Sequence, residues 1–175
     1  MTIGSDVMFA KLNSMGLFGM NAYPVQVEAD LSQGLPAFDM VGLPDAAVKE
    51  ARDRVRSALK NCGFDFPISR ITVNLAPADV KKEGPLYDLP LLLALLKASR
   101  QLDCNLEGSV FVGELSLSGE VRRINGVLPM VIQAREDGFQ RIFVPAENSA
   151  EGAVVDGIEV YPVAHIIPLI EFLSG

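Results

Sequence analysis

The sequence has one histidine, two cysteines and no tryptophan. Cys62 and Cys104 stand far apart without a CxxC spacing, and together with His165 they cannot supply a conventional zinc site. We therefore expect two buried or partly buried thiols in the reducing cytoplasm, and no metal or cofactor in this domain. No apolar run reaches the roughly 18–20 residues that a membrane span needs, because the longest, Leu89–Leu96, ends at Lys97. A secretory leader pattern is also missing at the N-terminus.

Basic residues are scarce in the last part of the chain. The formal net charge is −7, and after Arg141 the sequence contains no lysine or arginine while its carboxylates contribute −5. This acidity lowers the expectation of nucleic-acid binding, since phosphate contacts need clustered cations, but it leaves room for a local basic face. The 175 residues are 49% hydrophobic and 21% charged, which suits one ordinary globular domain with a real core.

Hydrophobic periodicity predicts an alternation of strands and helices. Residues 23–31 alternate with period two, and together with 37–43 they predict a β-hairpin. A helix is expected over 45–62, a strand over 69–78, and a second helix capped by Asp88. A long strand over 109–121 with a turn at Ser118–Gly119, a helix over 126–138, short strands at 141–145 and 158–163, and a closing helix at 164–173 complete the order. The order β-β-α-β-α-β-α-β-β-α places the chain in the α/β class, or in α+β with a mixed sheet.

The helix expected over 45–62 carries several cations opposite its apolar stripe: Lys49, Arg52, Arg54, Arg56 and Lys60. Two interpretations are open. The cations form a face that contacts phosphates, or they belong to a solvated face with Glu50–Arg54 and Asp53–Arg56 ion pairs at helical spacing. The adjacent pair Arg122–Arg123 raises the same question, because two guanidiniums in a turn can hold phosphates or a partner's carboxylates, or can lie idle in solvent.

The stretch "KKEGPLYDLPLLLALL", residues 81–96, combines two lysines, a Gly-Pro turn and the start of an apolar helix. Backbone N–H groups at a helix start can hold an oxyanion or a phosphate, and Lys81 and Lys82 precede this one. The stretch is not a P-loop, since the second Gly-Lys and the hydroxyl are missing. Nucleophilic catalysis needs a serine, threonine or cysteine, and the residue after the turn is Leu86. The residues alone therefore indicate a loop followed by a helix, not an enzyme site.

Three long segments carry a resemblance: "VEADLSQGLPAFDMVGLPDAAVKEARDRVRSAL", "RITVNLAPADVKKEGPLYDLPLLLALL" and "GELSLSGEVRRINGVLPMVIQAREDGFQRIFVPAEN". From Met8 onward the chain resembles the N-terminal domain of the ComM/YifB family of magnesium-chelatase-like AAA+ proteins. The resemblance implies the Lon-protease-like fold, also described as ribosomal protein S5 domain 2-like. We expect one Lon-like domain over 8–175, and we expect residues 1–7 to be a remnant of an expression vector.

Lon-type proteases use a serine–lysine dyad, with the serine just after a Gly-Pro and the lysine after a Gly-Gly-Leu. By the resemblance, the serine position is Leu86, after Gly84 and Pro85, and the lysine position is Leu128. Both side chains are aliphatic, so neither a nucleophile nor a base is present and a residual peptidase is disfavoured. The resemblance thus implies a vestigial protease site in a domain that is not itself an enzyme.

The family resemblance also implies a role in DNA metabolism. The full-length protein is expected to be an ATPase and helicase that promotes branch migration in natural transformation, with ATP and magnesium bound by an AAA+ motor domain downstream and with a homo-hexameric assembly. In this reading the domain serves assembly and DNA engagement; the alternative is a pure oligomerisation scaffold or partner-binding module without DNA contact. The candidate DNA-binding residues are Lys49, Arg52, Arg56, Lys60, Lys81, Lys82, Arg122 and Arg123.

Overall fold

The computed structural model describes residues 8–175 and is built on a long antiparallel hairpin. Strand β1 (Met8–Phe18) pairs with β2 (Asn21–Ser32) from Met8 opposite Leu31 to Phe18 opposite Asn21. Ala10, Leu12 and Ser14 lie on the buried side of β1, and the Ser14 hydroxyl donates a hydrogen bond to the Phe111 carbonyl. The sequence pattern predicts no strand over 8–18, because a polar serine on the inner face and Phe9 on the outer face obscure the period of two.

The hairpin forms the centre of a seven-stranded mixed sheet with the order β3-β4-β2-β1-β5-β8-β9. The further strands are β3 (Ala37–Val41), β4 (Arg70–Ala76), β5 (Ser109–Phe111), β8 (Arg141–Pro145) and β9 (Glu159–Val163). β4 pairs antiparallel with β2 and parallel with β3, while β5, β8 and β9 extend the other side in parallel. The mixed α/β class is confirmed. The predicted hairpin over 23–43 is wrong, because β4 is inserted between β2 and β3.

The strand predicted over 109–121 is three short strands. β5 ends at Phe111, after which β6 (Glu114–Leu115) and β7 (Val121–Arg122) form a separate two-stranded ribbon. The expected turn at Ser118–Gly119 is present: Gly119 has a φ of +92°, a conformation that glycine adopts without a steric penalty. The chain therefore leaves the sheet after three residues, and this departure brings Glu114 and Leu115 over the helices.

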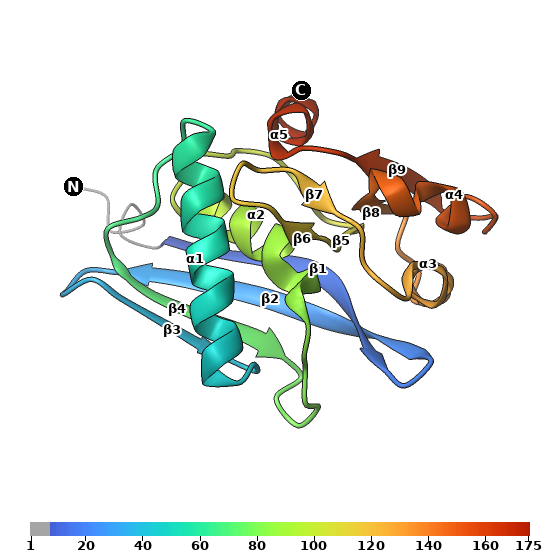
Figure 1. Cartoon of the computed structure of the whole chain (residues 1–175), viewed down its shortest axis with the longest axis horizontal. Coiled ribbons are helices and arrows are strands. Elements are labelled where there is room, and N and C mark those ends of the chain that lie inside the picture. Colours follow the sequence, from blue (N-terminus) through green and yellow to red (C-terminus); the bar gives the residue numbers. More distant parts are fainter. Residues whose placement is uncertain (1–7) are drawn as a thin grey trace.

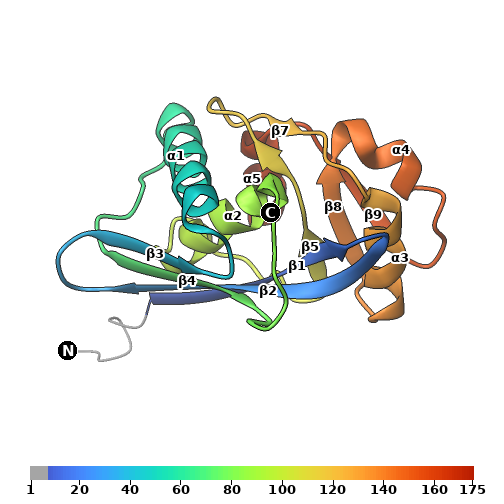
Figure 2. The ribbon, with the colours of Figure 1, turned by 60° about the horizontal axis from the view of Figure 1, so that its bottom comes forward.

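The helices are α1 (Asp45–Asn61), α2 (Asp88–Ala98), α3 (Val127–Glu136), α4 (Ser149–Gly152) and α5 (Ile166–Ser174). Figures 1 and 2 show α1 and α2 over one face of the β3-β4-β2-β1 half of the sheet, whose opposite face lies open. The open face carries polar side chains such as Lys11, Gln26 and Thr72, as expected for an antiparallel sheet packed on one side only. His165 caps α5, because its Nδ1 accepts a hydrogen bond from the Ile167 N–H at 3.1 Å.

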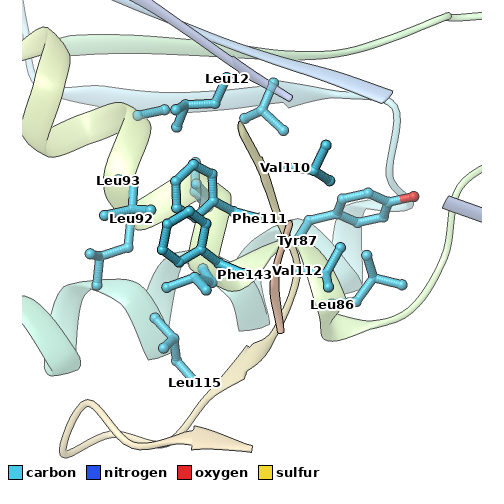
Figure 3. Close-up of a cluster of buried hydrophobic side chains, with 14 of the residues drawn as sticks. Leu12, Leu86, Tyr87, Leu92, Leu93, Val110, Phe111, Val112, Leu115 and Phe143 are labelled. Atoms are coloured by element: carbon cyan, nitrogen blue, oxygen red, sulfur yellow. The ribbon is translucent and has the colours of Figure 1, made fainter. Parts of the chain in front are cut away.

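Helix α2 is the centre of the core. Every residue from Leu89 to Leu96 is buried, so the helix is covered by the sheet below and by α1 and the β6–β7 ribbon above. Figure 3 shows its leucines beside Phe111 and Phe143, whose rings stack with centroids 4.6 Å apart. A helix that is apolar on all sides needs such surroundings. It also fixes the segment immediately before it, residues 84–88.

Candidate functional site

The turn before α2 is hydrogen-bonded to Gly113, which lies in the link between β5 and β6. Gly84 has a φ of +90°, and residues 85–87 form one 3₁₀ turn. The Leu86 carbonyl accepts a hydrogen bond from the Gly113 N–H at 2.9 Å, and the Gly113 carbonyl accepts one from the Leu89 N–H at 3.0 Å. The Leu86 side chain is only 7% exposed and lies within the apolar cluster of Figure 3. A leucine here therefore contributes to the core, where a serine hydroxyl would be poorly accommodated.

Asp88 does not cap α2 through its side chain, as the sequence analysis expected. It is the first residue of the helix, and its carboxylate accepts two hydrogen bonds from Arg54, Nε at 2.6 Å and Nη2 at 3.1 Å, and one from the Leu115 N–H at 3.1 Å. The carboxyl is 1% exposed, and this burial raises its pKa to about 6, although Arg54 and the Leu115 N–H oppose the rise. The pair ties α1, α2 and β6 together at the base of the turn.

A cleft of about 550 Å³ opens beside Leu86. One wall is the turn of the β1–β2 hairpin, and the other carries Glu83, Glu114 and Arg123. In the described part of the chain, the polar side chains of this lining are two carboxylates, one guanidinium and the amide of Asn125, which can bind a ligand by charge and hydrogen bonds. Leu128 lies in the first turn of α3, 36% exposed, and is not among the described residues that line the cleft. The two positions assigned to the dyad thus have different surroundings, one buried and one exposed.

Of the two lysines before the turn, Lys81 is exposed and Lys82 is not. The Lys82 side chain is 1% exposed, and its ammonium group donates hydrogen bonds to the carbonyls of Pro77 and Val80. Burial lowers the pKa of this ammonium. This burial argues against a contact between Lys82 and DNA, because a cation that folds the 77–82 loop around itself is not available to a phosphate.

The cations of α1 divide between two sides of the helix. Lys49, Arg52, Arg56 and Lys60 recur at intervals of three and four residues and form one stripe, which we call the α1 stripe. Arg54 points to the other side, toward Asp88, and its guanidinium also lies 3.9 Å from Glu50. The predicted Glu50–Arg54 pair is therefore present.

Within the α1 stripe, Arg52 and Arg56 have neighbours that the sequence pattern does not predict. Asp53 pairs with Arg52 at 3.3 Å, and not with Arg56 as the helical spacing predicts. The Arg56 guanidinium instead lies 4.7 Å from the centre of the Phe66 ring, a cation–π contact. The aromatic neighbour was missed because Phe66 lies in an irregular segment after α1. The one signal for it is the sequence "FDFP" directly after the helix.

Arg122 and Arg123 are both exposed at the end of β7. Arg123 lines the cleft beside Leu86, whereas Arg52 and Arg56 line a separate groove next to Phe38 and Phe66. Arg123 therefore lies at a different site from Arg52 and Arg56. None of the helices in the described part of the chain has the length and hydropathy that a bilayer crossing requires.

This mixed sheet has a Gly-Pro turn that leads into a buried helix. Sequence comparison identifies the class of protein to which it belongs as the magnesium-chelatase-like family. Residues 27–148 match the family described as subunit ChlI of Mg-chelatase, and the chain belongs to that family. It is 45% identical over 167 residues to YifB of Salmonella typhimurium, covering 95% of this chain and 33% of the relative. It is 42% identical over 163 residues to the competence protein ComM of Haemophilus influenzae, covering 93% of this chain and 32% of the relative.

A more distant relative is the Lon protease of Mycolicibacterium smegmatis, 26% identical over 168 residues, which cover 89% of this chain and 21% of that protein. The match is consistent with the Lon-like fold. The chain spans about a third of the length of the YifB and ComM relatives.

Proposed function

We propose that residues 8–175 form a non-catalytic Lon-like module of an AAA+ protein that acts on DNA in the cytoplasm. The whole protein would be an ATP- and magnesium-dependent helicase that promotes branch migration of DNA taken up in natural transformation, and it would work as a homo-hexamer. Family membership and the name of the competence relative support this proposal. In it, the module contributes to assembly and contacts DNA, while the motor hydrolyses ATP.

The non-catalytic role is supported by the state of the turn. Leu86 fills space in the core and Leu128 carries no amine, so the serine–lysine chemistry of a Lon-type site has no group to perform it. The carboxylate that directly follows the turn, Asp88, is engaged by Arg54 and by a backbone N–H. A buried, fully partnered carboxylate of this kind holds structure together.

The observation that carries DNA contact is the α1 stripe. Its four cations line one side of a regular helix, so their spacing is fixed by the backbone, and Lys49, Arg56 and Lys60 are exposed. Several cations on one rigid element can follow a phosphate backbone despite the net charge of −7. In a ring, such contacts repeat in every subunit, so a weak interaction per copy becomes a firm grip.

The test is fluorescence anisotropy with labelled single-stranded, duplex and four-way-junction DNA at about 50 and about 200 mM salt, the range in which phosphate contacts weaken strongly. The chain, biotinylated at its first residue, is measured alone and assembled on streptavidin, which supplies several copies at once. Light scattering gives its oligomeric state. We expect salt-sensitive binding that strengthens on streptavidin.

The matched variants carry equal changes of charge. K49E/K60E reverses two cations of the α1 stripe, and K11E/R135E reverses two exposed cations on β1 and α3. We expect the first variant to bind at least about tenfold more weakly and the second to change binding about twofold or less. Equal effects of both variants would mean that overall charge, not the α1 stripe, governs binding. A chain that oligomerises and binds no DNA even on streptavidin would point to the scaffold alternative.

A further inference from the structure

The groove beside the α1 stripe combines positive charge with an apolar floor. It has a volume of about 410 Å³ and lies between α1, the start of β3 and the segment that joins α1 to β4, which comes back alongside α1 in Figure 1. Phe38 and Phe66 lie in its lining with ring centroids 6.2 Å apart, and Ile68 stands at its rim with 88% of its surface exposed. β3 is an edge strand of the sheet, so the groove is open to solvent on that side.

Two charged residues are found among the described lining of the groove, and both are arginines: Arg52 and Arg56. The Arg56 guanidinium already lies over the Phe66 ring, 4.7 Å from its centre, so a cation and an aromatic ring meet at this side of the groove. Lys49 and Lys60 continue the row of cations one turn before Arg52 and one turn after Arg56. An occupant that is anionic along its length and has flat apolar groups would match both features.

We propose that this groove binds single-stranded DNA, with bases against Phe66 and Ile68 and phosphates on Arg52 and Arg56. The proposal rests on the DNA-contacting function proposed above and narrows it to one strand. In a duplex the base faces are stacked on one another and only phosphates reach this groove, so its apolar floor would remain exposed to water. A single strand offers unstacked bases, and stacking of bases on aromatic side chains in a basic groove is how such strands are held without sequence preference.

Among the residues that the structure describes, Asp53 is the acidic group paired with an arginine of the groove. Its carboxylate lies 3.3 Å from Arg52 and is exposed, so a phosphate must displace it. Exposed ion pairs of this kind stabilise a protein little. We therefore expect that replacing Asp53 frees Arg52 for the nucleic acid at almost no cost to the stability of the fold. The affinity for single-stranded DNA should then rise.

The experiment compares a labelled oligothymidine with a duplex of the same length, using the chain assembled on streptavidin. We expect the oligothymidine to bind at least about fivefold more tightly. F66L keeps apolar volume but removes the ring face, and I68S removes the exposed rim; each should weaken single-strand binding about fivefold or more and duplex binding less than about twofold. D53N should strengthen single-strand binding about two- to fivefold. V154S, at a position that is 70% exposed and outside the groove lining, is the control.

The outcomes separate this inference from the function on which it rests. If duplex and single strand bind equally, and F66L and I68S leave both unchanged while K49E/K60E still weakens them, base stacking is refuted and DNA contact survives. If poly-glutamate displaces the oligothymidine at equal concentrations of charge, the groove is a general site for anionic chains and the inference is refuted. If neither DNA binds the assembled chain, both proposals fail.

Discussion

The Asp88–Arg54 pair should be the most sensitive polar contact in the protein. Asp88→Ala removes the acceptor for two hydrogen bonds from Arg54 and one from the Leu115 N–H. Removing one partner of a buried pair costs about 3–5 kcal/mol. Because the Arg54 side chain keeps 22% exposure and can regain some hydration, we expect the lower end, about 3 kcal/mol.

Urea unfolding followed by circular dichroism at pH 7 measures this cost directly. Arg54→Ala leaves Asp88 buried without its cation and should also destabilise the chain. The double variant should cost less than the two single variants together, by about 1.5 kcal/mol or more, because the second substitution removes a partner that is already stranded. A loss below about 1 kcal/mol for Asp88→Ala, or additive losses in the cycle, would refute the view that this pair fastens α1 to α2.

The same carboxyl gives a pH dependence of defined sign. Its pKa in the folded chain is raised to about 6 from an ordinary value of 3.8, so folding takes up a proton between these values. The contribution to stability is complete below pH 3.8 and is lost as the pH rises through 6. Relative to Asp88→Asn, which does not titrate, the parent chain should therefore gain about 1 kcal/mol between pH 7 and pH 5. A flat or opposite difference between the two unfolding curves would contradict the raised pKa.

Three further predictions follow from particular contacts. Phe143→Ala should destabilise the chain by about 3–5 kcal/mol in urea unfolding, because a ring that is 1% exposed is stacked on both sides. Gly126→Ala should cost about 1–2 kcal/mol in thermal unfolding, since φ is +82° and the new methyl group would collide with the end of Leu17; no loss would mean that this turn is free to shift. Lys82→Met should leave DNA affinity within about twofold in the anisotropy assay, as a buried ammonium contacts no phosphate, and a larger drop would place Lys82 at the DNA.

Local sequence predicted helices α1, α2, α3 and α5 well, whereas the short α4 was not predicted. α1 has its apolar positions at intervals of three and four, and α5 has a histidine cap, and both signals lie within a few neighbouring residues. The pairing of strands was predicted poorly. The pattern over 23–43 indicated two strands correctly, but the partner of β2 is β4 on one side and β1 on the other, and this choice depends on residues far away in the chain.

By itself the sequence determined the α/β class and the apolar character of α2, because residue types and their spacing carry these properties directly. The dyad positions Leu86 and Leu128 were assigned by resemblance to Lon-type proteases. Only the tertiary structure decided which charges are available. It buries Lys82 against carbonyls, turns Arg54 inward to Asp88, and sets Arg56 on Phe66 beside an open groove. In the sequence these cations look alike, since charge is a property of the residue, whereas its exposure and partners arise from segments that meet only in the folded chain.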